Sequence, residues 1–239
     1  LPSFVELGVQ FFSPASAAPA FTAYGQPDNQ SSIVHNFEIG YDRQLPPIDG
    51  AFTTAIFYQY NDEMQGSSGE VSTLAGPIDQ TLYANFGDSQ MYGIELGLEG
   101  VYKQRWDWGA NYTYVNVEDE LRNQQNSAPR SAPHDYENTA VNHILNANVM
   151  YNADQWRAGL WGQYRSSFDD LTFLNPETTN TQYQFEEIGD QVVLSANFSY
   201  DLTDNVTWSV SGTGIIGDTR QHVGVDAEEV FWTSLRIEF

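Results

Sequence analysis

Ten stretches of this sequence alternate apolar or aromatic residues with small or polar ones, and this pattern constrains the fold more than any other feature. In the clearest stretch, residues 91–102, the even positions from Tyr92 to Leu98 are apolar, and the odd positions from Gly93 to Glu99 are glycine or glutamate. Successive side chains of a β-strand point to opposite faces, so the alternation predicts strands with one apolar and one polar face. The predicted strands are residues 4–12, 32–45, 51–61, 91–102, 106–117, 140–152, 155–166, 191–202, 205–217 and 230–239.

The length of these stretches separates two kinds of β protein. Each has about nine or more residues, which is what a tilted strand needs to cross a membrane. Strands of ordinary globular proteins are usually about five or six residues long. We therefore predict an all-β fold, an antiparallel up-and-down transmembrane β-barrel with its apolar face towards lipid and its polar face towards the lumen. A soluble β-sandwich has the same period, but would not gather tyrosine and tryptophan at both ends of one face.

Charge and composition exclude several classes of function. Aspartate and glutamate number 32 against nine lysines and arginines, which gives a net charge of −23. A field of this sign repels nucleic acids, so no nucleic-acid partner is expected. The chain has no cysteine, which excludes disulfides and thiolate metal sites. It begins at Leu1 rather than methionine, so we expect a processed or partial chain.

The links between the predicted strands alternate in length. Short links follow the second, fourth, sixth and eighth strands, whereas the long links are residues 13–31, 62–88, 118–139, 167–190 and 218–229. Outer-membrane barrels have short periplasmic turns and long extracellular loops, so this alternation predicts the orientation of every strand and a periplasmic C-terminus.

Two sets of charged residues are candidates for function. The first set lies on the polar face and could line a substrate path: Glu38, Glu95, Glu99, Arg157 and Arg165. The second set lies in the long links, where carboxylates could bind Ca²⁺ or simply keep the surface solvated. We favour solvation and predict no metal site. The acidic link residues are Glu118, Asp119, Glu120, Asp169, Asp170, Asp226, Glu228 and Glu229.

Catalytic motifs are absent from the sequence. There is no GxSxG, HExxH or P-loop. Asp169, Asp170 and His222 could meet near the loops, as the site of an outer-membrane protease requires. Acidic loop residues are usually only solvated, however, so we expect no enzyme and no cofactor.

The last strand resembles the end of outer-membrane barrel proteins, which commonly finish on phenylalanine after alternating apolar residues. Phe231, Leu235, Ile237 and Phe239 match this pattern. The resemblance implies that these four residues form a signal read by the barrel assembly machinery.

Several segments resemble TonB-dependent receptors, and they follow one another in the order of that family. They are HNFEIGYDRQL with GAFTTAIFYQYNDEMQG, MYGIELGLEG with WDWGANYTYVNVE, VNHILNANVMYN with WRAGLWGQYRSS, and GDQVVLSANFSYDLTDNVTWSVSGTGIIGD. The resemblance covers nearly the whole chain. One departure is Ile215, where the family has asparagine.

The resemblance implies a partner set and a function. The family barrel has about 22 strands, so residues 1–239 would form the C-terminal part of the barrel, without the plug domain. Expected partners are membrane lipid, the plug, the other barrel strands and the TonB system. The expected function is active uptake of a ferric siderophore, cobalamin or oligosaccharide across the bacterial outer membrane.

The alternative is a complete ten-stranded barrel that acts as a passive pore or a structural protein. It requires residues 4–12 to pair with residues 230–239.

Overall fold

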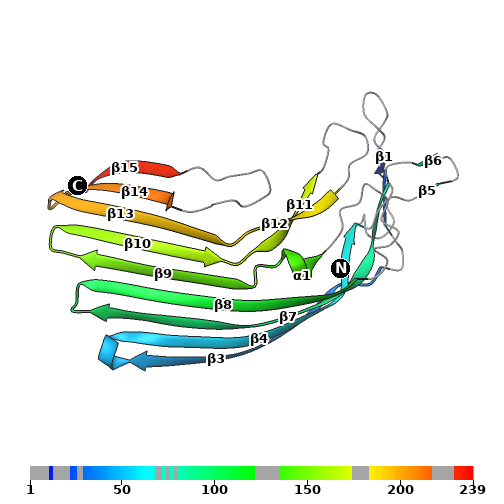
Figure 1. The fold of residues 1–239 in the computed structure, drawn as a ribbon, viewed down its shortest axis with the longest axis horizontal. Coiled ribbons are helices and arrows are strands. Elements are labelled where there is room, and N and C mark those ends of the chain that lie inside the picture. The colour runs from blue at the N-terminus through cyan, green and yellow to red at the C-terminus, as the bar shows by residue number, and fades with distance from the viewer. Residues whose placement is uncertain are drawn as a thin grey trace.

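Nine long antiparallel strands form one sheet in the computed structural model (Figure 1). The structure describes residues 11–12, 22–25, 29–67, 72–73, 76–77, 80–121, 135–173, 183–216 and 229–238. The long strands are β3 (Ile33–Leu45), β4 (Gly50–Ser67), β7 (Gln80–Tyr102), β8 (Trp106–Leu121), β9 (His143–Asn152), β10 (Trp156–Arg165), β13 (Gln191–Thr203), β14 (Val206–Ile216) and β15 (Val230–Ile237). They confirm nine of the ten predicted strands. Within the described residues, no helix is long and apolar enough to span a membrane.

Shorter elements lie mainly beyond one end of the nine long strands. They are β1 (Phe11–Phe12), β2 (Thr22–Gly25), β5 (Ser72–Thr73), β6 (Gly76–Pro77), β11 (Phe168–Phe173), β12 (Tyr183–Ile188) and the helix α1 (Tyr136–Thr139), and the 3₁₀ turn η1 (Pro46–Ile48) follows β3. Strands β1 and β2 belong to the same sheet, in which β2 pairs with the outer part of β7 in parallel. In Figure 1, β11, β12 and α1 all lie at the end of the sheet away from the short turns.

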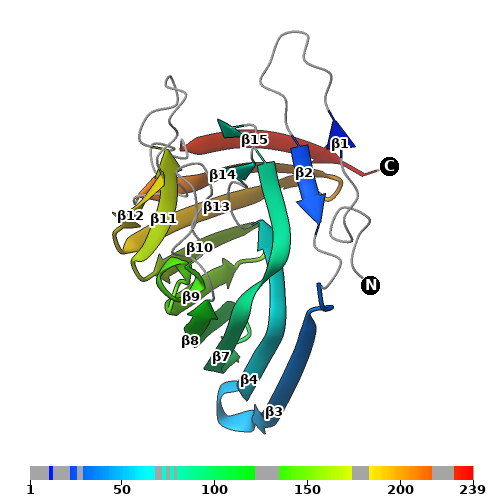
Figure 2. The ribbon, with the colours of Figure 1, turned by 90° about the vertical axis from the view of Figure 1, so that its right-hand side faces the viewer.

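The sheet is curved but not closed (Figure 2). Among the described residues, β15 pairs with β14 and β3 pairs with β4. Residues 4–10 of the first predicted strand lie outside the described residues. Phe11 and Phe12 pair with Ala23 and Thr22 of β2 instead of with β15. The closed ten-stranded barrel of the alternative is therefore not what the described strands form.

Strand register places the apolar residues of neighbouring strands on one face. Ile39 lies opposite Ile56, Ile56 opposite Ile94, and Ile94 opposite Tyr114. Directly opposite residues of an antiparallel pair project to the same side. This apolar face is open, with Ile39 80% exposed and Phe231 60% exposed. The described large apolar side chains with least exposure are Phe86 and Ile188, at 4% and 2%. The hydrophobic surface is thus turned outwards, as lipid contact requires.

The apolar band has the height of a membrane. On β7 it runs from Tyr102, beside a short turn, to Tyr92. At about 3.4 Å per residue and a tilt of about 45°, ten residue steps span about 24 Å. This agrees with the apolar band of about 25 Å in outer-membrane barrels.

Two strands continue well beyond this band, which corrects the prediction of a loop at residues 62–88. β4 has 18 residues and β7 has 23, and they stay paired up to Ser67 and Tyr83. The register shifts between Asn61 and Met64, where Glu63 has a φ of 51°. The sequence did not predict this extension because apolar and polar residues do not alternate there: Asp62 and Glu63 are adjacent, as are Leu82 and Tyr83, while the backbone pairing continues.

Candidate functional site

The polar face carries the five charged candidates. Glu95 lies opposite Thr113, which lies opposite Ile144, which lies opposite Arg165. This register row places Glu95 and Arg165 on one face, three strands apart. Regular alternation along β3, β7 and β10 adds Glu38, Glu99 and Arg157 to the same face.

The acidic members of this face have no cationic neighbour within the described ranges. Glu38, Glu95 and Glu99 are exposed, and no lysine or arginine nitrogen lies within 4.0 Å of their carboxylates. Between β3 and β7, strand β4 presents Ala51, Thr53 and Ala55. Glu95 and Glu99 therefore border a patch of small residues on the polar face, whereas Glu38 lies opposite Phe57.

The two arginines of this face have different partners. Arg157 Nη2 lies 3.8 Å from Asp201 Oδ1. Arg165 Nη2 donates to Gln191 Oε1 at 2.6 Å, a neutral acceptor. Gln191 is only 1% exposed. Arg165 Nε is buried and has no hydrogen-bond partner among the described residues.

A chain of amides crosses the polar face between these charges. Gln163 donates to Asn146, and Asn146 donates to Asn111, each at 2.8 Å. These bonds join β8, β9 and β10 through neutral side chains. They leave the middle of the polar face hydrophilic without adding charge.

Three predicted loop acids belong to a strand. Glu118, Asp119 and Glu120 lie near the end of strand β8, which extends to Leu121. The prediction that they belong to a loop was therefore wrong. Glu118 lies opposite Gln90, and Glu120 lies opposite Asp88. Gln90 Nε2 donates to Glu118 Oε2 at 2.5 Å.

These residues line a cavity of about 680 Å³ just beyond the apolar band. The lining residues that the structure describes include five carboxylates and no lysine or arginine: Asp88, Glu118, Asp119, Glu120 and Glu137, beside Tyr60, Ser89, Gln90, Tyr92 and Asn116. Its electrostatic character suits solvent or cations.

Asp119 also fixes the helix α1. Its Oδ2 accepts the backbone N–H groups of Tyr136 and Glu137, at 2.6 and 3.1 Å. Burial raises the pKa of the Asp119 carboxyl, although these two hydrogen bonds act in the opposite direction. Burial also raises the pKa of the Tyr136 hydroxyl, with help from the charge of Asp119.

The other acidic candidates do not join this cavity. Asp169 and Asp170 lie in β11, not in a loop, opposite Glu187 and Glu186 of β12. Glu229 is exposed immediately before β15. Asp226, Glu228 and His222 lie outside the described residues, so the protease arrangement stays untested.

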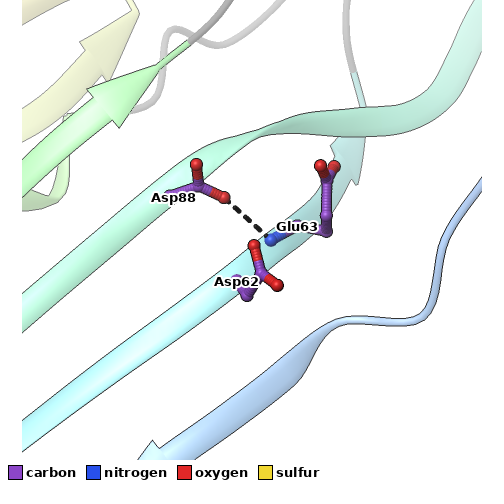
Figure 3. A group of neighbouring side chains, drawn as sticks. All are labelled: Asp62, Glu63 and Asp88. Carbon is purple, nitrogen blue, oxygen red and sulfur yellow. Dashed lines mark hydrogen bonds between the residues drawn. The ribbon is translucent and has the colours of Figure 1, made fainter.

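A group that the sequence analysis missed is the trio Asp62, Glu63 and Asp88 (Figure 3). One carboxylate oxygen of each lies within 4.8 Å of the others. The bulge in β4 brings them together, and Glu63 N–H donates to Asp88 Oδ1 at 2.9 Å. Carboxylates are ligands that Ca²⁺ accepts, but exposed acidic groups gather without a metal as well. In the sequence, the adjacent acids of the segment Asn61-Asp62-Glu63 were the only indication of this cluster. The register of β4 against β7 is what brings Asp88 beside them.

The predicted assembly residues lie on the apolar face of the sheet's edge strand. Leu235 lies opposite Trp208, and Ile237 lies opposite Val206. Phe231, Leu235 and Ile237 are 60%, 57% and 51% exposed. Phe239 lies outside the described residues. The role of these residues as a signal stays a prediction.

Comparison with known proteins identifies the sheet. The family model described as TonB dependent receptor-like, beta-barrel, matches residues 1–214. The protein named "Probable TonB-dependent siderophore receptor PiuA", from Acinetobacter baumannii, is 31% identical over 161 residues. That match covers 63% of this chain and 19% of the relative.

Two solved structures have the same fold. The enterobactin complex of a Pseudomonas aeruginosa ferric enterobactin receptor mutant, PfeA Q482A, matches with a TM-score of 0.66 at 12% identity, covering 100% of this chain and 37% of that one. The outer membrane transporter YddB from Escherichia coli matches with a TM-score of 0.63 at 12% identity, covering 94% of this chain and 35% of that one. The chain therefore spans about a fifth of the curated relative and about a third of these structures.

Proposed function

We propose that this chain forms part of the wall of a receptor that imports a ferric siderophore, because it belongs to the TonB-dependent receptor-like β-barrel family. Family membership places the chain in the outer membrane of a Gram-negative bacterium, in a receptor and transporter family. The siderophore is proposed from the similarity to the PiuA receptor of Acinetobacter baumannii.

The observation that carries the proposal is the register, which separates a lipid-facing surface from a polar one across the whole sheet. Every long strand contributes apolar residues to the same face. The opposite face would then line the lumen. No acid–base constellation is needed for this role, and we propose no catalysis by this chain.

The open sheet edges require the rest of the barrel. Unpaired backbone N–H and C=O groups cost several kcal/mol each in hydrocarbon. Strands from outside the described residues would pair with β3 and with β15 to complete a barrel of about 22 strands. The terminal residues Phe231, Leu235, Ile237 and Phe239 would direct this assembly by the barrel assembly machinery.

The exposed lumenal carboxylates support a contact with a plug domain. Glu38 and Glu95 face the lumen on either side of β4 without a cation of their own in the described structure. A plug supplied from outside residues 1–239 would present arginine or lysine to them. The TonB system would then release this contact to open the path.

Uptake of radioactive iron tests the proposed function. The gene is deleted in the source bacterium, and uptake of ⁵⁵Fe bound to its own siderophore is measured with and without an active TonB system. We expect deletion of either the gene or TonB to abolish saturable uptake. Uptake that persists without TonB would refute active transport and favour a passive pore.

A further inference from the structure

The short turn between β7 and β8 concentrates positive charge in an acidic chain. Lys103 is the only lysine in a sequence with a net charge of −23, and Arg105 follows it two positions later. Both side chains are exposed. Arg105 Nη2 lies 3.1 Å from Asp154 Oδ1, whereas no described carboxylate oxygen lies within 4.0 Å of Lys103 Nζ. Within the described structure, the turn thus presents one cation without a carboxylate and one beside a single carboxylate.

Lys103 occupies a backbone position that is costly for a lysine. Its φ is 52° and that of Gln104 is 58°, where glycine or asparagine is favoured. Backbone strain of this kind clusters at sites that bind ligands. The Lys103 ammonium lies 5.0 Å from the centroid of the Tyr102 ring, which belongs to the apolar face. This cation–π contact orients the ammonium beside the apolar face without neutralising its charge.

A row of aromatic rings leads away from this turn on the apolar face. Trp106 lies 4.7 Å from Tyr151, and Tyr151 lies 5.0 Å from Trp156, measured between ring centroids. The row continues to Phe198 and Trp208. Tyrosine and tryptophan favour the level of the lipid headgroups. The row therefore marks the depth of the headgroups and places the β7–β8 turn at that level.

The charge of the apolar face differs between its two ends. Near the short turns, Arg43 lies opposite Phe52, which lies opposite Leu98, so this arginine shares the apolar face. Strand carboxylates near the short turns alternate onto the polar face instead: Asp42, Glu99, Asp107 and Asp201. Towards the long loops, the even positions of β8 continue the apolar face to Glu118 and Glu120. The described rim of this face is thus basic at the short turns and acidic at the other end.

We propose that the β7–β8 turn docks the headgroup of an anionic phospholipid, with Lys103 and Arg105 on its phosphate and Tyr102 and Trp106 along its glycerol and upper acyl chains. Outer-membrane barrels have their short turns on the periplasmic side, where the leaflet consists of phospholipids. Basic side chains at a membrane surface attract anionic lipids. Cations beside an aromatic row fit a lipid, in which the phosphate continues into hydrocarbon. The inference concerns the lipid contact of the wall and goes beyond the proposed iron uptake.

The test uses the complete receptor in vesicles of phosphatidylethanolamine and phosphatidylglycerol, which differ in net charge. Native mass spectrometry of the receptor released from these vesicles gives the relative occupancy of the two lipids. The variants are Lys103→Gln, Lys103→Arg and Asp154→Asn. Arg236→Gln is the matched control, because Arg236 is an exposed arginine near the β13–β14 turn but lies opposite Thr207 on the polar face.

We expect the native receptor to retain phosphatidylglycerol in preference to phosphatidylethanolamine. Lys103→Gln should lower this preference about 5-fold, which is the contribution of one basic residue near an anionic membrane surface. Lys103→Arg should keep the preference because it keeps the charge. Asp154→Asn should raise it, because the carboxylate beside Arg105 no longer competes with the phosphate. Arg236→Gln should leave it unchanged.

Three results would overturn the inference: an unchanged preference in Lys103→Gln, an equal loss in Arg236→Gln, and a native receptor that retains both lipids equally. A loss in Lys103→Gln that Lys103→Arg does not share is a loss of charge and not of structure.

Inorganic phosphate is added as a competitor to separate a lipid from a free anion. It should not displace phosphatidylglycerol, because it lacks the acyl chains that contact Tyr102 and Trp106. Displacement at equal concentration would assign the turn to free phosphate and overturn lipid docking. Iron uptake is measured separately, so this inference can fail while the proposed function stands.

Discussion

At the scale of single residues, the two faces of one strand have opposite requirements. Leu96 and Glu95 are neighbours on β7, yet their register partners are Tyr112 and Thr113, one on the apolar face and one on the polar face. The sequence predicted this division because the period of side-chain direction in a strand is two. It could not predict which charged residues would be paired, since the ion pair of Arg157 with Asp201 depends on the register of β10 against β13.

Charge substitutions on adjacent residues should therefore differ in cost. Leu96→Arg lies near the middle of the apolar band and should lower the free energy of unfolding by about 2–4 kcal/mol, because a charge on the lipid face must be desolvated. Thr113→Arg, on the polar face beside Glu95, is the matched control and should change it little. Urea unfolding of the complete receptor in lipid vesicles measures both. Equal costs would show that the faces are assigned wrongly.

The turn between β7 and β8 is strained at two residues. Lys103 and Gln104 have φ values of 52° and 58°, as the central pair of a type I′ turn requires. Arg105 N–H donates to Tyr102 C=O at 3.3 Å across it. Neither residue is the glycine that this conformation favours.

Gln104→Gly should raise the free energy of unfolding by about 1 kcal/mol, because glycine adopts a positive φ without steric cost. The control is Asp204→Gly in the β13–β14 turn, where φ is not positive and glycine should give no gain. Denaturant unfolding of the complete receptor compares them. A loss of stability in Gln104→Gly would contradict the turn geometry.

At the scale of elements, the strand cores were predictable and their outer ends were not. Predicted residues 106–117 became Trp106–Leu121, and 91–102 became Gln80–Tyr102. Alternation marks a strand only where one face meets lipid. Beyond the apolar band, apolar and polar residues no longer alternate, so the signal disappears although backbone pairing continues. For the same reason Asp169 and Asp170 were predicted to lie in a loop, but they lie in the hairpin of β11 and β12.

Docking of α1 on β8 should depend on pH. The pKa of Asp119 is raised in the folded state by burial. A carboxyl with a raised folded pKa stabilises the docked state most below its unfolded pKa, and this contribution is lost as the pH rises through the folded value. Hydrogen exchange at the amides of Tyr136 and Glu137, corrected for intrinsic rates, should show protection that falls as the pH rises through this range.

The variant Asp119→Asn isolates this effect. It keeps an oxygen acceptor for the two amides but removes the titration, so protection should become independent of pH over the same range. If the protection of these amides still depends on pH in Asp119→Asn, the prediction is wrong and another group causes the pH dependence.

At the scale of the whole molecule, the sheet has a lipid-facing surface but two edges without described partners. The edge strands β3 and β15 are each paired on one side within the described structure. Backbone groups at such an edge have no water to bind inside a membrane. The described sheet is therefore a part of a wall and not a stable membrane unit by itself.

Residues 1–239 expressed alone should consequently fail to form a folded barrel in lipid vesicles. The complete receptor should show the heat-dependent electrophoretic mobility of a closed barrel, and the isolated segment should not. Mass spectrometry of the purified outer-membrane species should find peptides of a plug domain with those of this chain. If residues 1–239 alone form a stable species with heat-dependent mobility, the alternative of a complete small barrel would be supported instead.

The sequence by itself determined the fold class and the division into two faces, because alternation along a strand is a local property. It also indicated the family, through segments such as MYGIELGLEG that are read along the chain. The tertiary structure decided what lies side by side: the trio Asp62, Glu63 and Asp88, the cavity around Glu118, and the hydrogen bond of Arg165 to Gln191. These depend on the register between strands and on a bulge that shifts it, and both are set by pairing between distant segments.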